Sequence, residues 1–359
     1  MTTLAITELQ GDGIGPELQA SVHAIAEVLP LDFDFRGVDW SLETRERKGG
    51  VAIDQAEDSM RETRLVLKYP TVTGTRSPNA LIRRRVGFSV IYRPCISIPG
   101  IKSNFNLPVN LHIVRVATGG TYDDPGQLVG KDSAVSLRLV ERGPCEEAAA
   151  FAFELARKKG LHVTSSSKHT IQKVTDGLFQ TIVGDVHRGY QDVLHKTELF
   201  DALLGKVLIR PQDYQVVCVL NEYGDFLSDM AAGLVGSLGT GASGNYSFNE
   251  KREIEIAMFD PAGGTAPDIA GQDICNPTAM LLSLGMLLDH IDRNDLGHAL
   301  RNSLLGAIRD GECTRDLGGE LGTRDFTSVV CDRLSDAMGR GDGSAAQAAE
   351  AAAREGQTD

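Results

Sequence analysis

Apolar residues along the chain fall into short runs bounded by glycine and proline, and longer segments with a helical repeat separate these runs. The short runs predict strands at 4–9, 64–70, 88–94, 109–117, 161–166, 215–224 and from 256 onward. The helical repeat predicts helices after Pro16, over 145–160 and over 276–291, and the Ala- and Gly-rich tail 339–359 predicts a frayed final helix. Strands that alternate with helices in this way predict an α/β fold.

The composition is that of an ordinary globular protein with an acidic balance. The 359 residues are 42% hydrophobic and 24% charged, with a net charge of −13, and the length predicts about two domains. This charge argues against nucleic acid or an anionic membrane as the main partner, whereas a small anionic substrate requires a local cluster of basic residues. Because we find no membrane span, no signal peptide and no CxxC pair, we expect a cytoplasmic protein with reduced cysteines.

The segment NEYGDFLSDM at 221–230 carries two acidic residues in a setting of small and apolar ones. On a helix, Asp225 and Asp229 lie on one face, one turn apart, where like charges repel. A divalent cation between the two carboxylates explains both of them, whereas a solvated first helical turn explains one. The pattern alone leaves both interpretations open.

Basic residues at the ends of predicted strands are the candidates for binding an anion. Arg83, Arg93 and Arg115 lie in or beside apolar segments, and Lys168 follows the strand at 161–166. A single such arginine is more often part of a structural ion pair, and a lysine is more often on the surface. Three arginines together predict a pocket for a polycarboxylate, because the guanidinium group matches the geometry of a carboxylate.

Two glycine-rich loops raise the question of a nucleotide site. GDGIGPE at 11–17 does not fit the GxGxxG spacing, so it predicts a tight strand-to-helix turn and not a Rossmann fingerprint. GGTAPDIAG at 263–271 is dense in small residues whose exposed N–H groups suit the phosphates or adenine of a nucleotide. A simple turn before the helix at 276 explains the second loop equally well.

Six motifs occur in an order that resembles the metal-dependent β-decarboxylating dehydrogenases, which form the isocitrate/isopropylmalate dehydrogenase family. They are GDGIGPE, SxNxxxR, RPC, KxxxxKxTDGLF, NxYGDxLSDxAAGLVGSLG and GTAPDIAGxxxxNPTAM. The motifs are most similar to those of isocitrate or homoisocitrate dehydrogenases and imply a two-domain α/β fold with a mixed sheet, which is not a Rossmann fold. The resemblance also implies a large cofactor-side domain from 1–98 and 257–359. The small domain, 99–256, would carry the interface of a homodimer with shared active sites.

The resemblance further implies roles for individual residues. Mg²⁺ or Mn²⁺ is expected at Asp225 and Asp229, together with Asp201 contributed by the other subunit. Lys168, also from the other subunit, is expected to handle the hydroxyl proton, and Tyr122 to protonate the product carbon. The carboxylates of the substrate are expected at Ser77, Asn79, Arg83, Arg93 and Arg115. NAD is expected at Gly264, Thr265, Ala266, Asp268 and Asn276, where the Asp268 carboxylate favours ribose hydroxyls over a 2′-phosphate.

Several positions depart from the family pattern. Asp260 and Gly263 stand where the family has Glu and His, and Val116 and Ala117 stand where it has Glu and Asn. The metal and catalytic positions are kept, so the resemblance implies NAD- and metal-dependent oxidative decarboxylation of an isocitrate-like 2-hydroxy acid. The products would be a 2-oxo acid, CO₂ and NADH. One alternative is the same chemistry on homoisocitrate, isopropylmalate, tartrate or a phosphonate analogue. The other alternative is a non-catalytic regulatory subunit of a dehydrogenase.

Overall fold

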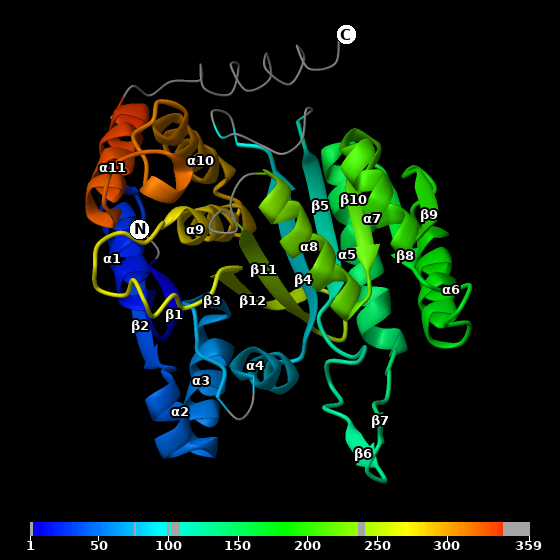
Figure 1. Ribbon diagram of the computed structural model, residues 1–359. Coiled ribbons are helices and arrows are strands. Elements are labelled where there is room, and N and C mark those ends of the chain that lie inside the picture. Colours follow the sequence, from blue (N-terminus) through cyan, green and yellow to red (C-terminus); the bar gives the residue numbers. More distant parts are fainter. Residues whose placement is uncertain (1–2, 75–76, 99–100, 102–107, 236–240, 340–359) are drawn as a thin grey trace.

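A computed structural model describes residues 3–74, 77–98, 101, 108–235 and 241–339 (Figure 1). The predicted tail helix and the last residues of the AAGLVGSLG motif lie outside these ranges. None of the helices in the described ranges is long and apolar enough to cross a bilayer. All six cysteines are free, and five of them are buried, as the sequence predicts.

A ten-stranded mixed sheet runs through the whole molecule, in the order β2-β1-β3-β12-β11-β4-β5-β10-β8-β9. The first block of strands comprises β1 (Leu4–Gln10), β2 (Phe33–Asp39), β3 (Leu65–Lys68) and β12 (Ile254–Pro261), which are parallel to one another. The second parallel block comprises β5 (Asn110–Val116), β10 (Val216–Val219), β8 (Val163–Ser167) and β9 (His195–Leu199). The antiparallel strands β11 (Ala242–Phe248) and β4 (Phe88–Ile96) join the two blocks.

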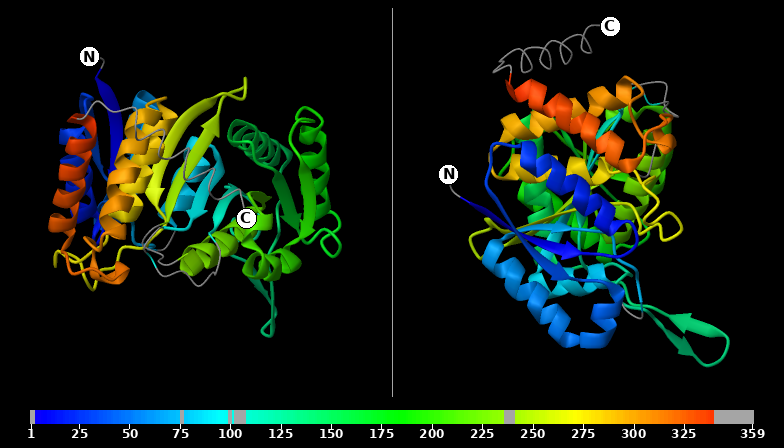
Figure 2. Two further views of the ribbon diagram at one scale, coloured as in Figure 1. Left: turned by 90° about the horizontal axis from the view of Figure 1, so that it is seen from above. Right: turned by 90° about the vertical axis from the view of Figure 1, so that its left-hand side faces the viewer.

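One face of the sheet is covered along its whole width by a single apolar core. The helices on this face are α1 (Gly15–Val28), α5 (Arg142–Lys159), α6 (Thr175–His187), α9 (Thr278–His290), α10 (Asn294–Arg309) and α11 (Thr323–Gly339). In Figure 2, α1, α9, α10 and α11 gather at one end of the sheet. We call this side of the sheet the back face.

The opposite face, which we call the front face, is covered by two separate apolar clusters. One cluster packs α3 (Gly50–Thr63) and α4 (Pro78–Val86) against the first block, and α2 (Leu42–Lys48) contacts α3. The other packs α7 (Phe200–Ile209) and α8 (Asn221–Val235) against the second block. A cleft between α4 and α8 is therefore left above the central strands. The small hairpin of β6 (Gln127–Val129) and β7 (Ser133–Val135) projects from the body (Figures 1 and 2).

The fold is α/β with a mixed sheet, as predicted, and it is not a Rossmann fold. The predicted strand at 215–224 is too long, because β10 ends at Val219 and α8 begins at Asn221. The apolar run ends at Leu220, and the polar residues after it already belong to the helix. The sheet is continuous across the predicted domain boundaries, through the pairing of β11 with both β4 and β12. The division of the chain at 98 and 257 stays a prediction.

The GDGIG segment forms the tight turn that its glycines predict. Gly13 has a positive φ of 59°, and a Cβ at this position would lie 2.0 Å from the carbonyl oxygen of Thr265. The Ile14 amide donates to that same oxygen at 3.0 Å. The turn therefore anchors the GGTAPDIAG loop by close backbone contact.

Candidate active site

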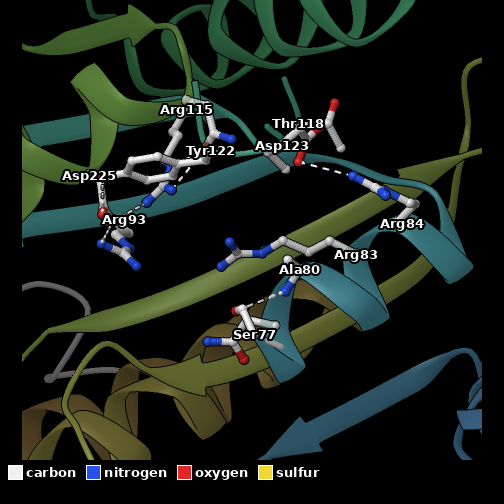
Figure 3. A pocket seen from close by; sticks show the side chains of 13 residues that line it. Ser77, Ala80, Arg83, Arg84, Arg93, Arg115, Thr118, Tyr122, Asp123 and Asp225 are labelled. Atoms are coloured by element: carbon white, nitrogen blue, oxygen red, sulfur yellow. Dashed lines mark hydrogen bonds and ion pairs between the residues drawn. The ribbon is translucent and has the colours of Figure 1, made fainter. Parts of the chain in front are cut away.

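A cavity of about 290 Å³ lies in the cleft between α4 and α8, and we call it the front cavity (Figure 3). Its walls include Ser77, Asn79 and Arg83 from α4 and its N-cap, Arg93 from β4, Arg115 from β5, Tyr122, and Asn221 and Asp225 from α8. All five predicted substrate residues thus line one cavity, together with one predicted metal ligand and one predicted catalytic residue.

The α4 wall is fixed by local capping. Ser77 is the N-cap residue of α4, where its hydroxyl accepts a hydrogen bond from the Ala80 amide at 3.3 Å, and Pro78 occupies the first turn. The buried Oδ1 atom of Asn79 has no hydrogen-bond partner. This acceptor is free to take a hydrogen bond from a ligand or a water molecule in the cavity.

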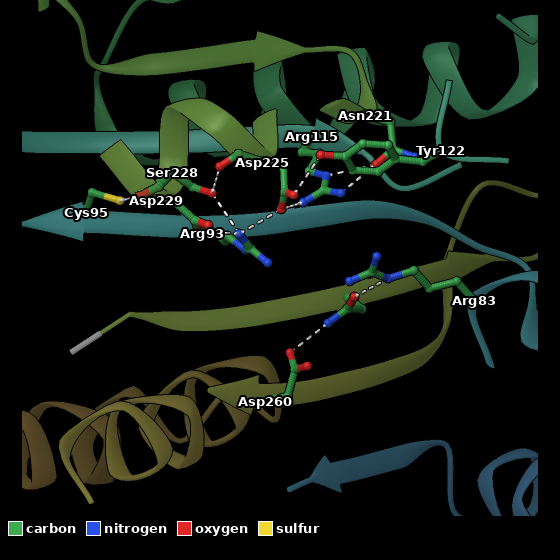
Figure 4. Close-up of polar contacts among 11 residues, drawn as sticks. Arg83, Arg93, Cys95, Arg115, Tyr122, Asn221, Asp225, Ser228, Asp229 and Asp260 are labelled. Atoms are coloured by element: carbon green, nitrogen blue, oxygen red, sulfur yellow. Dashed lines mark hydrogen bonds and ion pairs between the residues drawn. The ribbon is translucent and has the colours of Figure 1, made fainter. Parts of the chain in front are cut away.

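Arg93 and Arg115 reach the front cavity because of the alternation of side chains along β4 and β5. Arg115 is buried: its Nε and Nη2 atoms donate to Oδ1 of Asn221 at 2.9 and 2.7 Å, and its Nη1 atom pairs with Asp225 (Figure 4). A Cβ at Gly224 would lie 2.6 Å from the Arg115 side chain, so glycine is required for this approach. Burial lowers the pKa of Arg115 to about 9, and the neighbouring Arg93 and Arg83 contribute.

Arg83 approaches the cavity from the α4 side. Its Nε atom donates to Oδ1 of Asn245 at 3.4 Å, and the Asn245 amide in turn donates to Asp260 at 3.0 Å. Figure 3 shows the guanidinium group extending across the cavity toward Arg93. Burial lowers the pKa of Arg83 to about 10, which reflects the cost of a desolvated cation without a close carboxylate.

The two aspartates of the NEYGDFLSDM segment share one cation in this structure, the guanidinium group of Arg93. Its Nη1 atom lies 3.4 Å from a carboxylate oxygen of Asp225 and 3.4 Å from one of Asp229, and 2.7 Å from the Ser228 hydroxyl. Burial opposes ionisation of Asp225, but Arg115 and Arg93 outweigh it and lower the pKa of that carboxyl. The pKa of Asp229 is raised, mainly by burial and partly by the Asp225 charge. Both carboxylates therefore lie on one face of α8, beside the same guanidinium group, and their role as metal ligands stays a prediction.

Tyr122 lies beside Asp225 at the mouth of the front cavity. Its hydroxyl donates to Oδ2 of Asp225 at 3.0 Å, and its ring packs with the Arg115 guanidinium carbon 5.8 Å from the ring centroid. Burial and the Asp225 charge raise the pKa of Tyr122 to about 12. The phenol is therefore protonated at neutral pH and able to act as a proton donor.

Lys168 and Asp201 form a second polar site within the same chain. Their side chains pair with each other at 2.7 Å, and neither lines the front cavity. Lys168 follows β8 and Asp201 follows β9, at the same sheet edge as Arg115 at the end of β5. Adjacent strands lie about 4.8 Å apart, so β8 is about 10 Å from β5. The contribution of this pair to the site of another subunit stays a prediction.

Carboxylate oxygens are the ligands that Mg²⁺ and Mn²⁺ prefer, and Asp225 and Asp229 supply them at the cleft. No group of three His, Cys, Asp or Glu side chains able to hold a metal occurs within the described part of the single chain. The two aspartates therefore fit an ion that takes further ligands from substrate, water or a second chain.

A smaller cavity of about 160 Å³, the loop cavity, adjoins the front cavity and shares Arg93 with it. Gly263, Gly264 and Asp229 contribute to its walls. A Cβ at Gly263 or Gly264 would meet no atom within 4 Å, so the loop leaves open space there. This open cradle fits the reactive end of a nucleotide cofactor beside the front cavity.

The other predicted cofactor residues differ in their surroundings. Thr265 anchors the GGTAPDIAG loop, Ala266 has a positive φ of 38°, and Asp268 is exposed. The Asn276 amide donates to Asp316 at 2.8 Å, and its oxygen accepts from the Thr278 amide at 2.9 Å. The roles of these residues in cofactor binding stay predictions.

The sequence analysis missed residues that hold the site together. Asn221 accepts a hydrogen bond from Arg115 and Ser228 accepts one from Arg93, and we call these two arginines the arginine clamp. Asn221, Asp225, Ser228 and Asp229 form one stripe along α8, a signal that was available in the sequence. Lys68, Asn245 and Asp260 form a buried polar group behind Arg83, with Lys68 lying 3.7 Å from Asp260. Their spacing along the chain offers no comparable signal.

The chain belongs to the isocitrate/isopropylmalate dehydrogenase family, whose model matches residues 5–336. It is therefore a dehydrogenase that acts on CH–OH groups. The mitochondrial NAD-dependent isocitrate dehydrogenase subunit alpha of Homo sapiens is 35% identical over 341 residues, covering 92% of this chain and 90% of that protein. Subunit 2 of the corresponding enzyme of Schizosaccharomyces pombe is 33% identical, with 92% and 87% covered. The crystal structure of isocitrate dehydrogenase from Methylococcus capsulatus is similar with a TM-score of 0.83 at 31% identity, and 92% and 99% of the two chains are covered.

Proposed function

We propose that the protein catalyses the NAD- and divalent-metal-dependent oxidative decarboxylation of an isocitrate-like 2-hydroxy acid. This acid carries a carboxylate on the carbon next to the hydroxyl-bearing one, and the products are a 2-oxo acid, CO₂ and NADH. The observation that carries the proposal is the front cavity, where Arg83, Arg93 and Arg115 face Asp225 and Tyr122. In the lining of this cavity the arginines, which also include Arg84, outnumber the aspartates Asp123 and Asp225 and leave net positive charge for an anionic substrate.

The residues of the chain divide the work by position. Arg83, Arg93 and Arg115 bind the carboxylates and hold the substrate in one pose. Ser77 and Asn79 at the start of α4 provide polar groups for the third substituent of the substrate, and the orphaned Oδ1 atom of Asn79 supports this assignment. These two polar residues favour an isocitrate-type substituent over an apolar one.

The proposed reaction includes two proton transfers. In its uncharged form, Lys168 Nζ of the other subunit accepts the proton of the substrate hydroxyl. Tyr122 Oη donates a proton to the carbon that loses CO₂. Asp225 and Asp229, with Asp201 of the other subunit, would hold Mg²⁺ or Mn²⁺, and the loop at 263–271 would hold NAD. When bound, the metal supplies a Lewis acid and NAD supplies a hydride acceptor.

We also propose a homodimer with shared active sites. Support comes from large apolar side chains that are exposed on α7, α8 and the β6–β7 hairpin, among them Ile209 at 76%, Phe226 at 56% and Leu128 at 77%. Exposed apolar side chains in such number mark an interaction surface. The separation of the Lys168–Asp201 pair from the front cavity is consistent with its use by a second chain.

The proposed reaction is tested with purified protein, Mn²⁺ and NAD⁺ against isocitrate, homoisocitrate, isopropylmalate, tartrate, malate and phosphonate analogues, followed by NADH absorbance. We expect isocitrate or a close analogue to be turned over. A phosphonate analogue is the second candidate, because Arg84 lines the front cavity with a side chain that is 70% exposed. No turnover with any member, in protein shown to be folded, would support the regulatory-subunit alternative instead.

Subunit mixing tests the shared sites. Random exchange between Lys168→Ala and Asp225→Asn chains gives heterodimers in which one site carries both changes and the other carries none, so about a quarter of wild-type activity returns. The matched control mixes Lys168→Ala with Asp201→Asn, where every site keeps one change and activity stays absent. Exchange without recovery in the first mixture contradicts the arrangement.

A further inference from the structure

A second cavity, larger than the front cavity, lies on the back face of the sheet. It encloses about 590 Å³ between β4, β5 and β11 on one side and helices α5, α9 and α10 on the other, and its lining also includes Ala232 and Val235 of the front-face helix α8. We call it the back cavity. This volume falls within the range of about 300–1,000 Å³ that is typical of sites for small molecules.

Strand alternation separates the two cavities. Tyr92 and His112 face the back cavity, and their neighbours along the two strands, Arg93 and Ile113, face the front. Tyr246 on β11 lies opposite Val90, which shares the face of Tyr92. The back cavity is therefore built by the same strands as the active site, but with different side chains.

An aromatic floor covers the strand side of the back cavity. The ring of Phe151 lies 5.8 Å from that of Tyr92 and 4.9 Å from that of Tyr246. His112 is 2% exposed, and its Nδ1 atom lies 2.7 Å from the Tyr92 hydroxyl. Among the described residues no hydrogen bond holds its Nε2 atom. Such a floor suits a flat or branched apolar group.

Each helix presents one stripe to the back cavity. From α5 these are Phe151, Leu155, Lys158 and Lys159; from α9 they include Leu282, Met286 and Asp289; and from α10 they are Asn294, His298, Arg301 and Leu305. The spacings of three and four residues place each set on one helical face. The α5 and α9 stripes run from apolar to charged residues along the helix, whereas the α10 stripe is polar except for Leu305.

The charges of the back cavity favour an anion. Arg301 and Asp289 neutralise each other through two hydrogen bonds of 2.7 and 2.9 Å. Lys158 and Lys159 have no ion pair among the described residues, and Asp292 is the one other carboxylate in the lining. Burial lowers the pKa of Lys159, with Asp289 opposing the change. A carboxylate bound beside the two lysines would therefore gain an ion pair without breaking one.

We propose that the back cavity is a second ligand site, separate from the active site, for a small molecule with an aromatic or branched apolar body and one carboxylate. The body packs on Tyr92, Phe151 and Tyr246, and the carboxylate meets the lysines at the end of α5. The site adjoins the loop cavity, because Pro94, Cys95, Ala232, Gly241 and Ala242 line both. Its occupant thus contacts the wall of the loop cavity but not the arginine clamp.

The probe is 3-phenylpropionate, titrated into the full-length protein by isothermal calorimetry, with 3-phenylpropionamide as its uncharged counterpart. We expect one molecule per chain, and the amide to bind more weakly by about tenfold or more. Saturating isocitrate does not displace the probe, because isocitrate occupies the front cavity.

Two kinds of variant locate the probe. The double change Lys158→Glu and Lys159→Glu weakens binding by about tenfold or more, whereas Lys48→Glu with Lys196→Glu, an equal charge change at exposed positions outside the cavities, does not. Met286→Trp fills the cavity and abolishes binding, with circular dichroism as the check on folding. The absence of binding up to about 10 mM, competition by isocitrate, or equal affinity in the lysine variant and its control overturns the proposal.

Discussion

Replacing Arg83 by Met is expected to make the ligand-free protein more stable and, at the same time, unable to bind its substrate. The guanidinium group lies among Arg93, Arg115 and Lys68, and its one hydrogen bond among the described residues is the 3.4 Å contact of Nε with Asn245. Methionine keeps the methylene packing of the arginine stem and removes the desolvated charge.

The magnitude follows from the lowered pKa of Arg83. Each tenfold change in proton affinity is worth about 1.4 kcal/mol, so burial that lowers the pKa to about 10 corresponds to about 3 kcal/mol of destabilisation. Solvent screening at the cavity mouth and the lost hydrogen bond reduce the gain to about 1–2 kcal/mol. In thermal melts of a chain of 359 residues this corresponds to a rise of about 1–3 °C.

The sign of the pH dependence is fixed by the same shift. Between the folded pKa of about 10 and the higher unfolded value, the native arginine binds fewer protons than the unfolded one, so wild-type stability rises with pH there. The penalty is fully present below about pH 10 and is lost above it. The advantage of Arg83→Met therefore shrinks as the pH passes this value.

The assay is differential scanning fluorimetry at neutral pH, with and without isocitrate and Mn²⁺. Arg84→Met is the matched control: Arg84 is 70% exposed and lies 3.5 Å from Asp123, so the change is expected to stay within about 0.5 kcal/mol. Added ligand stabilises the wild type and the control but not Arg83→Met. A melting temperature of Arg83→Met at or below that of wild type without ligand would refute the electrostatic reasoning.

Three further predictions concern metal and cofactor. Asp225→Asn is expected to lower kcat by about 100-fold or more with an unchanged circular dichroism spectrum; full activity in this variant, or in excess EDTA, contradicts the metal assignment. Gly263→His is expected to lower the KM for NAD⁺ more than it changes kcat, because a Cβ there meets no atom within 4 Å; an unchanged KM places the histidine away from the cofactor. Initial rates at matched metal and substrate are expected to favour NAD⁺ over NADP⁺ by more than about tenfold, since the exposed Asp268 carboxylate repels a 2′-phosphate; equal efficiency rules out its proximity to the ribose.

The sequence predicted the positions of side chains best where these side chains belong to a regular strand or helix. The apolar runs around Arg93 and Arg115 predicted strands, and in the structure the register of β4 with β5 places both guanidinium groups on one face. The spacing of Asp225 and Asp229 predicted one helical face, which α8 provides. These features depend on local periodicity, which a sequence displays directly.

Pairings between distant segments were not predictable in the same way. Arg83 forms a hydrogen bond with Asn245, which lies 162 positions away in the sequence. Asp260 reaches Asn245 through the pairing of two strands, which no local sequence pattern predicts. The sequence also suggested a metal between the two aspartates, whereas the side chain of Arg93 lies between them in the single chain. An arginine can supply the same positive charge from the neighbouring strand, and only the fold brings it there.

The two faces of β4 and β5 explain how one pair of strands serves two cavities. In front, Arg93 and Arg115 converge on Asp225. Arg83 adds a third positive charge, and the repulsion among the three arginines persists until an anion binds. Behind, the Tyr92 hydroxyl and His112 form a hydrogen bond within an aromatic surface, where a buried charge would be costly. A shift of β4 moves Tyr92 and Arg93 together, because they are consecutive residues on a paired strand. Any occupant of the back cavity that alters the position of β4 must therefore alter the position of the arginine clamp.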